Sequence, residues 1–240
     1  MGSFDVVAEK FDQLWFFSAS YQNWMLKNVC QLLSLEKTDR FADLGGGTGA
    51  FTAKVAAAAE LDHPAACVEP SREMLSMANC IGGLHTYHST AEEFASKRPR
   101  GINKALIKEA VHHIKDRKAF WSNLFADADM DKTVVVTRPK RPGFVLFEQA
   151  YEAFSESQPH LSELQGEIES VGLNAQVDMQ SWKVELPKEE WFGLLRMRFN
   201  SALFTCSDRD IEEGILQIDD ALDGSTILFE DTIIYLSASR

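Results

Sequence analysis

Side chains suited to binding a charged ligand gather first around a run of glycines. Asp43 precedes Gly45, Gly46 and Gly47 in Asp43-Leu-Gly-Gly-Gly-Thr-Gly49. Alternating glycines let the backbone turn with positive φ and approach a ligand with no Cβ in the way. An apolar segment precedes the turn, and the helix-forming residues 51–59 follow it, so free N–H groups are expected at the start of a helix. The pattern predicts a strand, a nucleotide-binding turn and a helix.

Two classes of cofactor use such a turn. Gly45, Gly47 and Ala50 loosely match the dinucleotide fingerprint, with Glu69 about 20 residues further on, so a nicotinamide-dependent oxidoreductase stays open. Asp43 counts against it, because a carboxylate repels a pyrophosphate and attracts an ammonium or a sulfonium group. The long helical segment before the turn also departs from the dinucleotide pattern.

Four segments occur in the order that a known family shows. Asp43–Gly49 resembles motif I of the class I S-adenosylmethionine (SAM)-dependent methyltransferases, and it is followed by Val68-Glu-Pro-Ser71, Ser89-Thr-Ala-Glu92 and Lys108–Ile114. The resemblance covers nearly the whole chain. It implies an enzyme of the small-molecule type that uses SAM and releases S-adenosylhomocysteine. It also implies an α/β fold with a seven-stranded, mostly parallel, doubly wound (Rossmann-like) sheet whose last strand is inserted antiparallel.

The resemblance assigns the cofactor-binding positions. Glu69, at a strand end, would accept the ribose hydroxyls, and Thr90 and Ala91 would lie beside the adenine. Glu92 is equally well explained as an acid in the first turn of a helix. An N-terminal helix would cover the cofactor, with contacts from Phe11-Asp12, Trp15, Phe17 or Tyr21, although aromatic residues there are also explained by packing alone. The expected cofactor-binding residues are Tyr21, Asp43, Gly45, Gly46, Gly47, Glu69, Pro70, Thr90, Ala91, Lys108 and Glu109.

Three residues are candidates for acting on the methyl acceptor: His112, Arg138 and Arg196. His112 follows the fourth predicted strand and would serve as a base near its natural pKa if the acceptor loses a proton; a thioether acceptor needs none. His113 beside it is more simply explained by packing. Arg138 begins a turn rich in cations, and Arg196 or Arg198 would point inward from a helical insertion.

Inward-facing guanidinium groups predict an anionic acceptor, most simply a carboxylate-bearing metabolite methylated on O, N or S. One candidate is 4-methylthio-2-hydroxybutyrate, which is methylated on sulfur in algal dimethylsulfoniopropionate synthesis. Each arginine is equally well explained by an ion pair with a surface acid. A catalytically silent SAM-binding protein is the other alternative, and the set of Asp43, Glu69 and His112 argues for an enzyme.

Composition limits the kinds of binding partner and the cellular compartment that are expected. The chain has 240 residues and a formal net charge of −12, which opposes binding to nucleic acid. The four cysteines are scattered without Cys-x-x-Cys spacing, so neither a disulfide framework nor a metal site is expected. Without a signal peptide or a span of membrane length, the expected location is the cytoplasm, as a monomer or homodimer.

Periodicity predicts the elements that position these residues. Strands are expected at 40–44, 65–69, 84–88, 104–108, 133–137, 175–186 and 226–236. Helices are expected as two segments within 4–35, broken around 18–20, and at 72–79, 118–128, 144–154, 161–171, 190–200 and from Asp208 to 222. The chain is interpreted as one domain: an N-terminal lid (1–36), a core (37–186 and 226–240) and a helical substrate cap (187–225).

Overall fold

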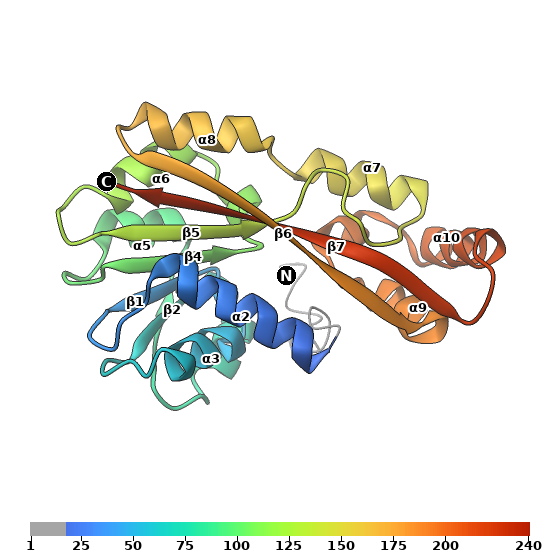
Figure 1. Cartoon of the computed structure of the whole chain (residues 1–240), viewed down its shortest axis with the longest axis horizontal. Coiled ribbons are helices and arrows are strands. Elements are labelled where there is room, and N and C mark those ends of the chain that lie inside the picture. Colours follow the sequence, from blue (N-terminus) through green and yellow to red (C-terminus); the bar gives the residue numbers. More distant parts are fainter. Residues whose placement is uncertain (1–17) are drawn as a thin grey trace.

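The computed structural model describes residues 18–240, and their seven strands form one sheet (Figure 1). The strand order is β3-β2-β1-β4-β5-β7-β6. Neighbours from β1 to β5 pair in parallel, and β7 pairs antiparallel with both β5 and β6. The strands are β1 (Phe41–Leu44), β2 (Ala65–Glu69), β3 (Leu84–His88), β4 (Lys104–Lys108), β5 (Lys132–Thr137), β6 (Asn174–Pro187) and β7 (Thr226–Ser239). The predicted doubly wound, mostly parallel sheet with an inserted antiparallel strand is confirmed.

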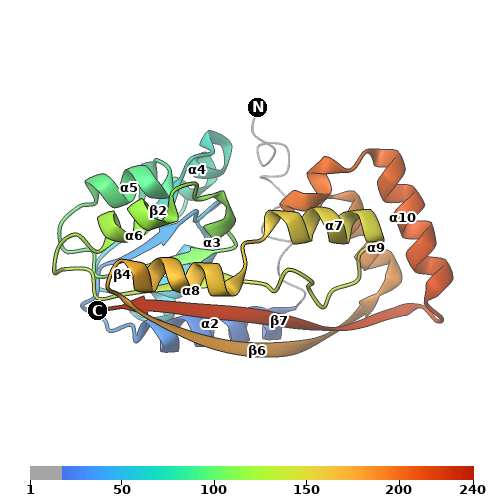
Figure 2. The ribbon, with the colours of Figure 1, turned by 90° about the horizontal axis from the view of Figure 1, so that it is seen from above.

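Helices cover both faces of the sheet (Figures 1 and 2). On one face, α2 (Ala19–Leu33) and α3 (Ala50–Ala58) bury apolar side chains against the central strands. On the other face lie α5 (Ala91–Lys97), α6 (Arg117–Leu124) and α8 (Leu161–Ser170). The short α4 (Arg72–Ala78) packs on β2 and β3. Each face therefore has its own apolar core, as a sheet with two buried faces requires.

The strands β6 and β7 continue past the parallel strands as a two-stranded ribbon (Figure 2). A third apolar cluster forms around this ribbon. It is built by α7 (Glu148–Ser157), α9 (Lys188–Arg196), the 3₁₀ helix η2 (Ser201–Thr205) and α10 (Asp208–Ala221). Trp191 is fully buried at its centre, with its ring against Phe199 and Phe229. The insertion before the last strand thus has a hydrophobic core of its own.

The helix expected at 118–128 ends at Leu124. Two other helices differ from the prediction for local reasons. The helix expected at 190–200 ends at Arg196, because Arg198 takes a left-handed conformation (φ 53°) and Asn200 then caps η2. The helix expected from residue 144 begins at Glu148, since the preceding segment packs closely on the ribbon. A Cβ on Gly143 would lie 1.7 Å from the carbonyl oxygen of Glu230, which leaves no room for any other residue there.

The N-terminal helix begins where the sequence placed a break. Ser18 caps α2 by accepting a hydrogen bond from the Tyr21 N–H at 3.1 Å. Met25 and Val29 of α2 are buried on the sheet. The part of the expected lid that contains Phe11, Asp12, Trp15 and Phe17 lies outside the described residues. Within residues 18–240, no helix combines the length and the apolar character needed to cross a bilayer.

Candidate active site

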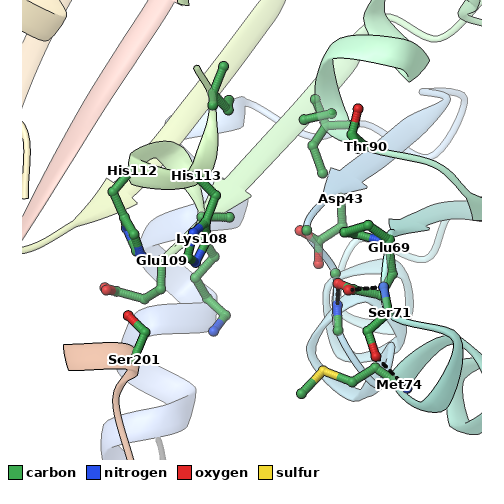
Figure 3. Close-up of a pocket in the computed structure, with 18 of the residues that line it drawn as sticks. Asp43, Glu69, Ser71, Met74, Thr90, Lys108, Glu109, His112, His113 and Ser201 are labelled. Atoms are coloured by element: carbon green, nitrogen blue, oxygen red, sulfur yellow. Dashed lines mark hydrogen bonds between the residues drawn. The ribbon is translucent and has the colours of Figure 1, made fainter. Parts of the chain in front are cut away.

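A cavity of about 930 Å³ opens at the carboxyl ends of the parallel strands, where open α/β sheets bind ligands. Its walls come from the segments that follow β1, β2, β3 and β4, and from the elements around the ribbon (Figure 3). The expected site residues that line it are Asp43, Gly45, Gly46, Gly47, Glu69, Pro70, Thr90, Ala91, Lys108, Glu109 and His112. Tyr21, Arg138 and Arg196 are not among its lining residues.

The glycine turn is fixed by packing within the protein. Gly45 has φ 84°, and its N–H donates to the Val68 carbonyl at 2.8 Å. A Cβ on Gly45 would lie 2.7 Å from the Cβ of Ala110, and one on Gly46 would lie 2.7 Å from the sulfur of Cys67. These glycines are therefore required by the close approach of the loop after β4 and of strand β2.

Asp43 lines the cavity, and only one of its two carboxylate oxygens has a hydrogen-bond partner among the described residues. Its Oδ2 accepts a hydrogen bond from the Thr52 hydroxyl at 2.7 Å, whereas its buried Oδ1 has no partner among the described residues. Burial raises the pKa of Asp43 to about 6, against the opposing effects of the Thr52 hydrogen bond and of Lys108. A buried anionic oxygen without a partner calls for a cation or a hydrogen-bond donor, which fits the ammonium group of SAM.

Glu69 is held in place by two backbone amides, as Figure 3 shows. Its Oε2 accepts from the Gly47 N–H at 3.0 Å and its Oε1 from the Ser71 N–H at 2.8 Å. Each oxygen of an ionised carboxylate has a second lone pair. The carboxylate is therefore pre-oriented at the end of β2 and able to accept two neighbouring hydroxyl groups, which fits a ribose.

The segment after β3 forms the next part of the wall. Thr90 caps α5: its hydroxyl accepts from the Glu93 N–H at 3.2 Å, and Glu93 bonds back to the Thr90 N–H. Glu92 lies in the first turn of α5 and also lines the cavity, where it accepts from the Lys115 N–H at 3.0 Å. Glu92 is therefore an acid in the first turn of a helix that also lines the cavity, and its place beside an adenine stays a prediction. Ala91 begins the helix, so the backbone here presents a helix N-terminus to the cavity.

The opposite wall carries Lys108, Glu109 and His112 (Figure 3). Glu109 has φ 53°, an uncommon value for a residue with a side chain, and its Oε1 accepts from Arg138 at 2.6 Å. Burial raises the pKa of Glu109, and Arg138 and Lys108 oppose that rise. A strained backbone and a dedicated cation together hold this carboxylate at the end of β4.

His112 differs from the expectation of a base near its natural pKa. It lies in the 3₁₀ helix η1 (Val111–His113), with its ring 4.1 Å from that of His113. Burial, helped by His113, lowers the pKa of His112 to about 3. The imidazole therefore stays neutral at physiological pH and is too weakly basic to serve well as a general base. Both of its ring nitrogens are buried without a hydrogen-bond partner in residues 18–240.

Arg138 and Tyr21 are not among the residues that line the cavity and belong to a buried hydrogen-bond network. Arg138 donates to Asp231 at 2.9 Å through two nitrogens, and also to Glu109 and the Tyr21 hydroxyl. That hydroxyl in turn donates to Asp231 at 2.6 Å. Although burial disfavours its charge, Asp231 and Glu109 raise the pKa of Arg138 well above its ordinary value. With these partners, Arg138 positions Glu109 and is not directed at an acceptor.

Arg196 also lies outside the lining of the cavity. It forms a two-pronged ion pair with Glu212 of α10 at 2.8 and 2.9 Å, and its side chain is 45% exposed. Arg198 donates to Asp208 through one nitrogen at 2.7 Å, and the same nitrogen donates to the Cys206 carbonyl at 3.2 Å. Both guanidinium groups tie α9 and the segment after it to the start of α10, outside the cavity.

Among the cavity-wall residues that the sequence analysis missed, four lie far from the predicted motifs: Phe154, Gln158, Asn200 and Ser201. They come from α7 and η2 around the ribbon. Asn200 is 3% exposed, and its Oδ1 accepts from the Leu203 N–H at 3.3 Å. The sequence signal was a polar pair inside an apolar stretch, Phe199-Asn-Ser-Ala-Leu203. The expected helix at 190–200 concealed this signal.

Comparison of the sequence with protein-family models and with curated proteins finds no match. Solved structures do resemble the chain. A putative methyltransferase of an antibiotic biosynthesis pathway from Anabaena variabilis superposes with a TM-score of 0.61 at 17% identity, over 88% of this chain and 95% of that one. Phosphoethanolamine N-methyltransferase 2 of Haemonchus contortus, in complex with phosphomonomethylethanolamine and S-adenosylhomocysteine, gives 0.62 at 13% identity, over 98% of this chain and 57% of that one.

The mycolic acid cyclopropane synthase CmaA1, complexed with S-adenosylhomocysteine, gives a TM-score of 0.58 at 12% identity, over 92% of this chain and 85% of that one. Identities this low establish likeness of fold only. The chain has the fold of these SAM-dependent methyltransferases, as the order of its four motifs predicted.

Proposed function

We propose that this protein is a methyltransferase that transfers the methyl group of SAM to a small-molecule acceptor. The observation that carries the proposal is the unpartnered Oδ1 of Asp43, buried in the wall of the cavity beside the glycine turn. A dinucleotide pyrophosphate would be repelled there, whereas an ammonium group would be attracted. The shared fold, and the S-adenosylhomocysteine in two of the similar structures, support the same assignment.

The chain's own residues divide into two roles. Asp43 would bind the ammonium group of the cofactor, and Glu69 its ribose hydroxyls, with Pro70, Thr90 and Ala91 along the adenine. Lys108 and Glu109 would line the side of the cavity opposite Asp43 and Glu69. When bound, SAM supplies an electrophilic methyl group. The protein would contribute orientation of the acceptor at attacking distance and exclusion of water.

The charge of the methyl acceptor has to be inferred from other residues than those assigned to the cofactor. The expectation of a carboxylate rested on Arg138 and Arg196, and their ion pairs remove that support. A thioether acid such as 4-methylthio-2-hydroxybutyrate would therefore lack the guanidinium partners expected for its carboxylate. If the acceptor loses a proton on methylation, Glu109 is a better candidate base than His112, because burial raises the pKa of Glu109 and lowers that of His112 to about 3.

Calorimetric titration of the purified protein with S-adenosylhomocysteine and, separately, with NAD tests the cofactor. Micromolar affinity for S-adenosylhomocysteine that is lost in Asp43→Ala is the expected result, with Asp220→Ala, on the exposed face of α10, as the matched control. Binding of NAD alone would overturn the proposal in favour of an oxidoreductase. Screening small molecules for release of S-adenosylhomocysteine from SAM then distinguishes an enzyme from a silent SAM-binding protein.

A further inference from the structure

Two polar side chains in the cavity wall have buried hydrogen-bonding atoms that residues 18–240 leave without a partner. The Nδ2 of Asn200 and both ring nitrogens of His112 are closed to solvent, and none has a partner in the part of the chain that the structure describes. Leaving such a group unsatisfied costs about 1–3 kcal/mol. Both residues line the same cavity, one from η2 and the other from η1.

The orientation of the Asn200 amide is settled by its local role. The residue caps η2, and only its oxygen can accept the hydrogen bond from the Leu203 N–H. The NH₂ group is therefore the half of the amide without a partner. Serine, threonine or aspartate would cap a helix equally well without burying an unused donor. The amide thus offers donors that capping does not require.

The hydrogen-bonding atoms and charges of the cavity wall indicate which kind of ligand group could lie between Asn200 and His112. A neutral imidazole offers one donor and one acceptor, and the Asn200 NH₂ offers donors only. The two guanidinium groups expected to attract an anion are paired elsewhere. The same wall carries the carboxylate of Glu109, which is paired with Arg138, and the cation Lys108. An uncharged polar group would satisfy the unused atoms without adding a further charge to this wall.

We propose that Asn200 and His112 form the binding site for an uncharged, oxygen-bearing group of the methyl acceptor, such as an amide carbonyl or a hydroxyl. The acceptor oxygen receives a hydrogen bond from Asn200 Nδ2, and its N–H or O–H donates to the unprotonated nitrogen of His112. Phe154 of α7 supplies an apolar wall for the rest of the molecule. This inference rests on the proposed function, because it concerns the acceptor side of the same cavity.

The test uses the full-length protein saturated with S-adenosylhomocysteine and three probes of one carbon skeleton: benzamide, benzyl alcohol and benzoate. Binding is measured by saturation-transfer NMR and calorimetry. Benzamide should bind at least about tenfold more tightly than benzoate. Asn200→Ser keeps a capping oxygen and loses the amide donor, so it should weaken benzamide binding about tenfold or more. His112→Phe, which keeps a ring and loses both nitrogens, should act in the same direction.

The control is Asn123→Ser on the exposed face of α6, which should change the affinity for neither benzamide nor benzoate. Affinity for S-adenosylhomocysteine should be unchanged in every variant. Failure of the wild-type protein to bind S-adenosylhomocysteine would refute the proposed function itself. If S-adenosylhomocysteine binds, the inference alone falls in any of three cases: benzoate binds best, none of the probes binds, or both variants bind benzamide as the wild type does.

Discussion

Replacing Asp43 by asparagine should stabilise the ligand-free protein while weakening cofactor binding. Raising the pKa of a buried carboxyl from 3.8 to about 6 costs the folded state about 3 kcal/mol when the group is ionised at pH 7. Asparagine removes this cost and keeps an oxygen for the Thr52 hydroxyl. It also puts an NH₂ group where Oδ1 has no partner, which costs about 1–2 kcal/mol. The expected net gain is about 1–2 kcal/mol at pH 7.

The difference in free energy of unfolding between the wild type and Asp43→Asn should depend on pH. Because the folded-state pKa is raised, the folded protein binds this proton more tightly than the unfolded chain between pH 6 and about pH 4. Wild-type stability therefore gains from Asp43 as the pH falls through that window. The asparagine variant lacks this gain, so its advantage should shrink on acidification and reverse at about pH 5.

Urea denaturation of the ligand-free proteins at pH 7, 6, 5 and 4 measures both effects, with Asp220→Asn as an exposed control. Titration with S-adenosylhomocysteine at pH 7 should show affinity at least about tenfold weaker in Asp43→Asn, since a charged hydrogen bond is lost. A variant less stable than the wild type at pH 7, with a difference independent of pH, would refute the account of Asp43 as a buried, poorly satisfied carboxylate.

Three further predictions concern the turn and the arginines. Gly45→Val should abolish binding of S-adenosylhomocysteine in the same titration, because φ 84° and the 2.7 Å approach to Ala110 force the turn to move; unchanged affinity would contradict this. Arg138→Met should lower the free energy of unfolding by about 3–5 kcal/mol by leaving Asp231 and Glu109 without their cation, and urea denaturation should show that adding Asp231→Leu recovers only part of the loss, because Glu109 stays without that cation. Arg196→Ala removes an exposed ion pair with Glu212, so stability should change by less than about 1 kcal/mol and acceptor KM should not change; a raised KM would restore Arg196 to the acceptor site.

Local sequence was enough to predict that Asp43, Glu69 and Thr90 line one cavity. Asp43 and Glu69 lie in the last two residues of β1 and β2, Thr90 comes two residues after β3, and the carboxyl ends of parallel strands meet at one edge of the sheet. Strand periodicity, glycines and capping residues act over a few positions, so the chain itself predicts which of these side chains share that edge. The bounds of β2, β3 and β4 agree with the prediction for the same reason.

Contacts between distant segments decided the acceptor side. Arg138 meets Asp231, 93 positions away, and this pairing turns a candidate for binding an anion into a support for Glu109. Asn200 reaches the cavity only because the helix before it ends at Arg196 and the ribbon carries η2 to the sheet edge. The low pKa of His112 likewise depends on burial by the folded chain. The direction of a charged side chain and the solvation of a titratable one are set by partners that only the tertiary structure brings close, and no spacing in the sequence encodes them.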